Sequence, residues 1–76
     1  MSNTLDHLIY MANQIGRNLA RHHDAAGATA DHIATFWDPR MKTQIFEHVE
    51  RTGGQHLDPV ALAAVRQLAE RRTRSA

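Results

Sequence analysis

Apolar residues near the N-terminus recur with the period of an α-helix. At about 100° per residue they fall on one stripe, whose members are Leu5, Leu8, Ile9, Ala12, Ile15, Gly16 and Leu19. Tyr10, Gln14 and Arg17 fall on the opposite side. This pattern predicts an amphipathic helix over residues 4 to about 21. Gly16 lies on the buried stripe, where glycine weakens a helix, so it indicates either a compromise or a close crossing by another helix.

A second helix is predicted over residues 25–37. Asp24 precedes it and is suited to an N-cap, because its carboxylate can accept hydrogen bonds from the free amides of the first turn. The apolar positions that share one face are Ala26, Ala30, Ile33, Ala34 and Trp37. Gly27 weakens the first turn, so a start at Thr29 is the alternative.

The dipeptide Asp38-Pro39 predicts the end of the second helix and the start of a third. Proline disfavours helical angles at the residue before it and suits the first helical position after a cap. The third helix is expected over residues 39–52, and its buried side consists of Met41, Ile45, Phe46 and Val49. Gly53-Gly54 is expected to end it, because glycine readily adopts left-handed backbone angles.

Asp58-Pro59 repeats this arrangement as a second cap, before a fourth helix expected over residues 59–71. Leu57 and Leu62 have the spacing of a hydrophobic staple across its start. The inward positions of this helix are Ala61, Leu62, Val65, Leu68 and Ala69. Together the patterns predict an all-α fold, a compact single domain of four short helices.

The chain length fits one domain over residues 1–76. A chain of this size buries only about 60% of the surface that its unfolded form exposes, so its core is small. Residues 1–3 and 73–76 carry no apolar stripe and are expected to be disordered, as chain termini commonly are. So small a core favours a protein that gains stability from a partner.

Composition excludes several classes of protein. There is no cysteine, hence no disulfide, thiolate metal site or cysteine nucleophile. The formal net charge is +1, whereas a nucleic-acid binder normally concentrates basic residues on one face. The basic cluster of Arg71, Arg72 and Arg74 is interpreted as a solvated helix end. The polar N-terminal segment resembles neither a signal peptide nor a membrane span, and we expect a cytoplasmic protein.

The residues that could support catalysis or bind a metal are poorly placed. The histidines are His7, His22, His23, His32, His48 and His56. No two of them have the i and i+3 or i and i+4 spacing of a helical metal pair, and we expect exposed histidines on helix flanks and turns. Ser2 and Ser75 lie at the chain ends, and Gly53-Gly54 fits a helix end better than a phosphate loop. We therefore expect no catalytic, cofactor-binding or metal-binding residue in this chain.

The segment FWDPRM, residues 36–41, combines two aromatic residues with an acid, a proline and an arginine. Four of its residues are interpreted as structural: Trp37, Asp38, Pro39 and Met41. Phe36 falls on the flank of the second helix, and Arg40 points away from the apolar side of the third. Arginine and aromatic residues at a surface commonly anchor interfaces, so Phe36 and Arg40 are candidates for partner binding. The alternative for Arg40 is a local surface ion pair with Asp38.

The polar side of the first helix is rich in amides and comparatively low in charge. It includes Tyr10, Asn13 and Gln14. Aromatic residues are enriched at interfaces, and charged residues are depleted there, so these three residues are further candidates for partner binding. A simple solvated face is an equally good interpretation.

Three stretches of the chain resemble a known family. They are HLIYMANQIG (7–16), DHIATFWDPRMKTQIFEHV (31–49) and GGQHLDPVALAAVRQL (53–68). Together they resemble the small delta subunit of NAD-dependent, molybdenum-containing formate dehydrogenases. MANQI followed by HIATFWDPRM is the most specific part of this resemblance.

The resemblance implies a non-catalytic accessory subunit of a cytoplasmic formate dehydrogenase complex. Such a subunit is expected to aid assembly, stability or cofactor maturation of the catalytic subunit. Molybdopterin, iron–sulfur clusters, FMN and NAD are expected in other subunits of the complex, which are the expected partners. The chain itself is expected to bind no cofactor, small-molecule substrate, nucleic acid or membrane.

Two other functions fit the sequence less well. A small helical nucleic-acid-binding regulator would use the second and third helices as a helix-turn-helix. The near-neutral charge and the outward positions of Glu47 and Glu50 on the third helix argue against it. A stand-alone enzyme lacks a candidate nucleophile or ligand set.

Overall fold

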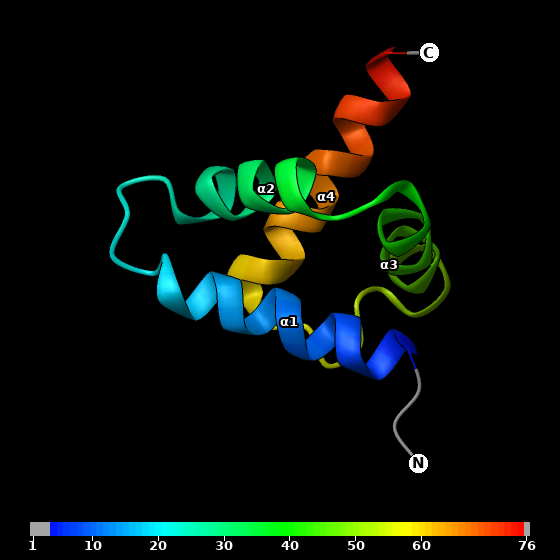
Figure 1. The fold of residues 1–76 in the computed structure, drawn as a ribbon, viewed down its shortest axis with the longest axis horizontal. Coiled ribbons are helices and arrows are strands. Elements are labelled where there is room, and N and C mark those ends of the chain that lie inside the picture. Colours follow the sequence, from blue (N-terminus) through cyan, green and yellow to red (C-terminus); the bar gives the residue numbers. More distant parts are fainter. Residues whose placement is uncertain (1–3, 76) are drawn as a thin grey trace.

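The computed structural model describes residues 4–75, with side chains described for residues 4–72. Its helices are α1 (Thr4–Asn18), α2 (Ala25–Phe36), α3 (Pro39–Thr52) and α4 (Pro59–Ser75) (Figure 1). The described residues contain no strand, and the predicted all-α fold of four helices is confirmed. Of the residues expected to be disordered, 1–3 and 73–76, residues 1–3 and 76 fall outside the described residues, and residues 73–75 belong to α4.

Two aspartates cap helices as predicted. Asp24 Oδ1 accepts a hydrogen bond from the Gly27 amide at 3.0 Å, and Asp38 Oδ1 accepts one from the Met41 amide at 2.9 Å. A Cβ at Gly27 would collide with the Asp24 carboxylate, so glycine at this position makes room for the cap. Thr29 is buried within α2, and the alternative start at Thr29 is wrong.

The start of α4 differs from the start of α3. The Leu62 amide donates to the Asp58 carbonyl oxygen at 2.8 Å, while the Asp58 carboxylate lies 3.5 Å from Nε of Arg17 on α1. The expected side-chain cap at Asp58 is therefore wrong, although the Asp-Pro dipeptide marks the correct helix start. Leu57 is half-buried against the core, and Leu62, in the first turn of α4, is half-buried.

Two helix ends differ from the predicted positions by more than one residue. Helix α1 ends at Asn18 rather than near residue 21, because the chain tightens into i to i+3 turns in which the Ala20 amide donates to Arg17 O at 3.3 Å. Helix α4 continues beyond residue 71 to Ser75. Its last turns contain Ala, Glu and Arg, which favour helices, and no glycine or proline that would end one.

Helix α4 crosses α1 and α2 and packs most extensively on α2 (Figure 1). The buried apolar residues come from all four helices: Leu8, Ile9, Ala12, Ala30, Ile33, Trp37, Ile45, Phe46, Ala61, Ala64, Val65 and Leu68. Ala34 is exposed, so its predicted place on the inward face of α2 is wrong. A Cβ at Gly16 would lie 3.5 Å from Ala61 N and from Val60 Cγ1, which are ordinary contact distances, so α1 passes beside the start of α4 here but the crossing does not require glycine.

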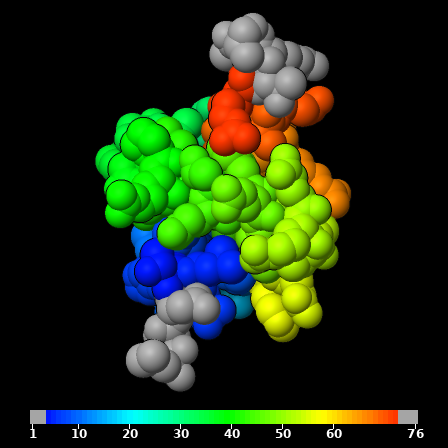
Figure 2. All heavy atoms as spheres, turned by 90° about the vertical axis from the view of Figure 1, so that its right-hand side faces the viewer, coloured from blue at the N-terminus to red at the C-terminus, as the bar shows by residue number. Residues whose placement is uncertain are grey.

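Helix α3 packs against α4 and α1. It occupies the middle of the face drawn in Figure 2, between the first turns of α1 and the last turns of α4.

Among residues 4–75 no helix is both long and apolar enough to cross a bilayer.

Candidate functional site

The link between α2 and α3 turns two adjacent aromatic residues in opposite directions. Trp37 is 4% exposed and lies in the core, whereas Phe36 is 70% exposed. The Trp37 amide donates to Ile33 O at 3.0 Å, and its extended angles (φ −89°, ψ 139°) end α2. Met41, in the first turn of α3, is half-buried against the core. The link is thus held by buried groups while it leaves one aromatic ring uncovered.

A shallow hollow opens beside this link, and we call it the α1–α2 hollow. It has a volume of about 280 Å³ and is lined by Tyr10, Met11, Gln14, Ile15, His32, Phe36, Trp37 and Met41. Tyr10 is 61% exposed on its α1 side. The His32 ring packs against the Phe36 ring, with 4.6 Å between their centroids. Three of the predicted partner-binding residues, Tyr10, Gln14 and Phe36, therefore come together around one hollow.

Arg40 is exposed in the first turn of α3. Within residues 4–72, its guanidinium forms no hydrogen bond or ion pair. Asp38, the predicted local alternative, uses Oδ1 to accept the Met41 amide. Arg40 thus keeps its donors available to another molecule.

Asn13, a further predicted partner-binding residue, has a different position. Its Nδ2 donates to His56 O at 3.0 Å, and its Oδ1 accepts from the Asp58 amide at 2.8 Å. The side chain is half-buried, and both ends of its amide hold the segment before α4. Asn13 therefore joins α1 to a distant part of the chain and is not among the residues that line the α1–α2 hollow.

His48 corrects the expectation that every histidine is exposed. It is 4% exposed, and Nε2 lies 2.7 Å from the carbonyl oxygen of Gln55. A carbonyl oxygen only accepts, so the ring donates this bond from Nε2–H. The imidazole therefore ties α3 to the loop after it, and sequence spacing gave no signal of this contact.

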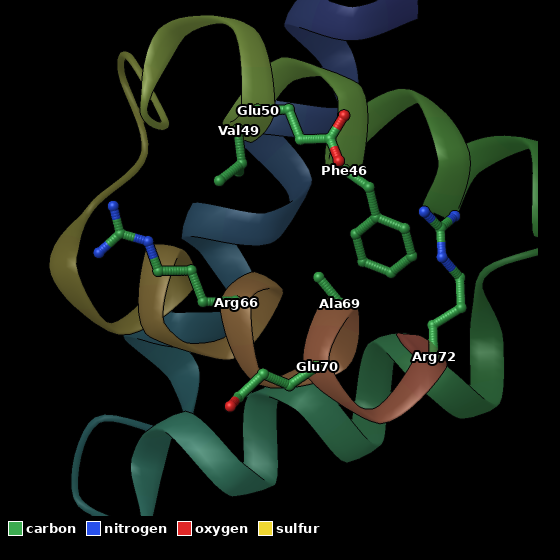
Figure 3. Close-up of a pocket in the computed structure, with 7 residues that line it drawn as sticks. All are labelled: Phe46, Val49, Glu50, Arg66, Ala69, Glu70 and Arg72. Atoms are coloured by element: carbon green, nitrogen blue, oxygen red, sulfur yellow. The ribbon is translucent and has the colours of Figure 1, made fainter. Parts of the chain in front are cut away.

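A larger hollow of about 600 Å³ lies between α3 and α4, and sequence reasoning missed it. Its lining residues are Phe46, Val49, Glu50, Arg66, Ala69, Glu70 and Arg72. Figure 3 shows the charged side chains around an apolar floor, with the Arg72 guanidinium beside Phe46. That guanidinium carbon lies 4.7 Å from the centre of the Phe46 ring, a cation–π distance. Only the assembled helices bring these positions together, so no sequence signal could have found them.

The described side chains also bear on a metal site and on a helix-turn-helix. Among residues 4–72 no group of three or more histidines, aspartates or glutamates is arranged to hold a metal ion. Glu47 and Glu50 are exposed on α3, the helix that a helix-turn-helix would place near phosphates, and acidic side chains oppose that contact.

The comparison with protein families decides what kind of protein this is. A model of the NADH-dependent formate dehydrogenase delta subunit, FdsD, matches residues 7–65. The chain belongs to the FdsD family. No curated protein and no solved structure matched it. The resemblance to delta subunits seen in the sequence is confirmed, and the part of this FdsD chain that matches includes every residue lining the α1–α2 hollow.

Proposed function

We propose that this chain is a non-catalytic delta subunit that binds other subunits of a cytoplasmic NADH-dependent formate dehydrogenase. The observation that carries this proposal is the family match over residues 7–65. That range contains α2 and α3 complete, nearly all of α1 and the first turns of α4. The family relationship therefore applies to the folded domain and not to one short motif.

In the proposed complex, formate oxidation and NAD reduction take place on other subunits. Those subunits carry the molybdopterin, iron–sulfur clusters, FMN and the NAD site, and this chain carries none of them. Its contribution is to aid assembly, stability or cofactor maturation of the catalytic subunit. The lack of cysteine supports this division of roles, since thiolates are the usual ligands of iron–sulfur clusters.

The surface of the domain supports a binding role. Tyr10, Phe36 and Arg40 are exposed, and these residue types are enriched among those that dominate binding energies. We propose these residues and Gln14 as partner-binding groups. Asn13 is left out because its amide already holds the segment before α4.

The proposal is tested by affinity purification of the tagged chain from its native cells. We expect the catalytic subunit of formate dehydrogenase to co-purify in a fixed ratio, while the tag alone retains none. Cells without the chain should contain less assembled and active complex, and expression of the chain should restore it. Absence of every formate dehydrogenase subunit from the purified material would count against the proposal.

A further inference from the structure

The α1–α2 hollow is where large apolar side chains remain uncovered. Among the described side chains, Tyr10 and Phe36 are the exposed large hydrophobic residues, and both line this hollow. Helices α1 and α2 pack against each other, and buried Trp37 forms part of the lining. The hollow is therefore preformed, and a partner side chain can enter it without moving the core.

A second hollow is lined by residues of α1 and α3. It has a volume of about 310 Å³ and is lined by Thr4, Leu5, Gln44, Glu47 and Arg51. Met41 lines the first hollow and Gln44 lines the second. Arg40 precedes Met41 and lies one helical turn before Gln44, on the same side of α3. Arg40 is therefore the residue next to Met41, at the α3 edge of the α1–α2 hollow.

No carboxylate of the described side chains pairs with the Arg40 guanidinium. Asp38 caps α3, and Asp31 pairs with Arg71 at 3.0 Å. Lys42 Nζ donates to a backbone carbonyl oxygen of α2 at 2.9 Å, which does not neutralise its charge. An added carboxylate beside Arg40 would thus meet unpaired positive charge.

Two further acidic residues, Asp6 and Glu47, each have a favourable electrostatic environment of their own. Asp6 lies in the first turn of α1, where the helix dipole favours a negative charge, and it has an interaction of its own. Glu47 shares the second hollow with Arg51, four residues further along the same helix. Neither acid forms an ion pair with Arg40 among the described side chains.

From this arrangement we infer that the α1–α2 hollow receives a segment of another formate dehydrogenase subunit with an apolar anchor side chain and a neighbouring carboxylate. The anchor packs between Tyr10 and Phe36, and the carboxylate pairs with Arg40. The inference rests on the proposed function and adds to it the surface and the chemistry of the partner. A second copy of this chain is a poorer occupant, because a two-fold contact centred here would bring the Arg40 side chains of both copies together.

The test measures binding of the full chain to formate dehydrogenase subunits purified from cells that lack it. The variants are Phe36→Ala, which removes an exposed ring, and Arg40→Glu, which reverses the charge. A glutamate in the first turn of α3 suits the helix dipole, so folding is retained and circular dichroism checks it. Arg21→Glu is the matched control, because Arg21 is exposed in the α1–α2 link and does not line the hollow.

We expect Phe36→Ala and Arg40→Glu each to raise Kd about tenfold or more, as loss of an anchor residue does. Arg21→Glu should bind like the unmodified chain. Affinity of the unmodified chain should fall with added salt, and more steeply than that of Arg40→Ala. A photo-crosslinker at position 36 should attach to a partner peptide that contains an apolar residue and an Asp or Glu close to it.

The outcomes separate this inference from the proposed function. If the unmodified chain binds and both variants bind equally well, the docking surface lies elsewhere and the proposed function stands. Crosslinks from position 36 to a second copy of the chain, or to a partner segment without acids, would also overturn the inference. If the unmodified chain binds no formate dehydrogenase subunit, the proposed function fails and the inference fails with it.

Discussion

At the scale of single residues, the neighbours Phe36 and Trp37 have different roles: Trp37 stabilises the fold, and Phe36 is available for recognition. Trp37 is 4% exposed and Phe36 is 70% exposed. Burial of a large ring stabilises the folded state because its apolar surface leaves water and makes dense contacts. An exposed ring gives the isolated domain little of this stabilisation and keeps its surface available for a partner.

We predict that Trp37→Ala lowers the free energy of unfolding by about 3 to 5 kcal/mol, through lost burial and a cavity. Phe36→Ala should change it by less than about 0.5 kcal/mol, as exposed positions usually do. Chemical denaturation followed by circular dichroism compares the two variants. Equal destabilisation by both would show that Phe36 also belongs to the core.

Asn13 leads to a second residue-scale prediction. Asn13→Ala removes the hydrogen bonds to His56 O and from the Asp58 amide, each worth about 0.5 to 1.5 kcal/mol. We expect unfolding to become easier by about 1 to 3 kcal/mol, and hydrogen exchange at the Asp58 amide to accelerate. Gln14→Ala is the matched control, since that neighbouring amide is exposed. If Asn13→Ala unfolds like Gln14→Ala, the two bonds contribute nothing measurable.

At the scale of helices, the features that depend on local chemistry were predictable from sequence. Pro39 and Pro59 begin α3 and α4, because proline fixes the backbone angle of a first helical residue. Gly53 ends α3 with φ of 78°, since a left-handed angle favours glycine. The apolar stripe of α1 likewise identified Leu8, Ile9 and Ala12, all of which are buried.

Features that depend on contacts between distant residues were not predictable in the same way. Asn13 bonds to residues 43 and 45 positions away, and no helical period contains that information. Asp58, expected to cap α4, instead lies beside Arg17 on another helix, at 3.5 Å from its Nε. His48 is buried because the loop after α3 folds back over it. The α3–α4 hollow has the same origin, since facing positions of two helices form it.

Two adjacent glycines allow a prediction about the end of α3. Both have left-handed angles, φ of 78° at Gly53 and 93° at Gly54, so alanine at either position costs about 1 to 2 kcal/mol. A Cβ at Gly53 meets open space, whereas a Cβ at Gly54 collides with Leu62. Gly54→Ala should therefore destabilise the protein more than Gly53→Ala in thermal melts. Equal melting temperatures would show that Leu62 moves aside without loss of packing.

At the scale of the whole molecule, the four helices depend on one another. Isolated helices of 12 to 17 residues are marginal in water, and packing supplies most of their stability. A domain of 76 residues is expected to have a free energy of unfolding of about 4 to 11 kcal/mol. Binding to another subunit would raise the free energy of unfolding by an amount that is a substantial fraction of this value.

The last prediction concerns how a bound partner stabilises the whole fold. A ligand that binds only the folded state reduces the unfolded population by a factor of 1 + [L]/Kd. Ala64 and Val65 are fully buried in α4, so their amides are expected to exchange with solvent through global unfolding. With the partner subunit at about 100 times its Kd, exchange of these amides should slow about 100-fold.

Hydrogen exchange with mass spectrometry follows the chain separately from its partner. Arg40→Glu should leave exchange of the free chain unchanged and lose most of this added protection. Protection confined to amides around the α1–α2 hollow, with α4 unaffected, would show that the core exchanges through local openings.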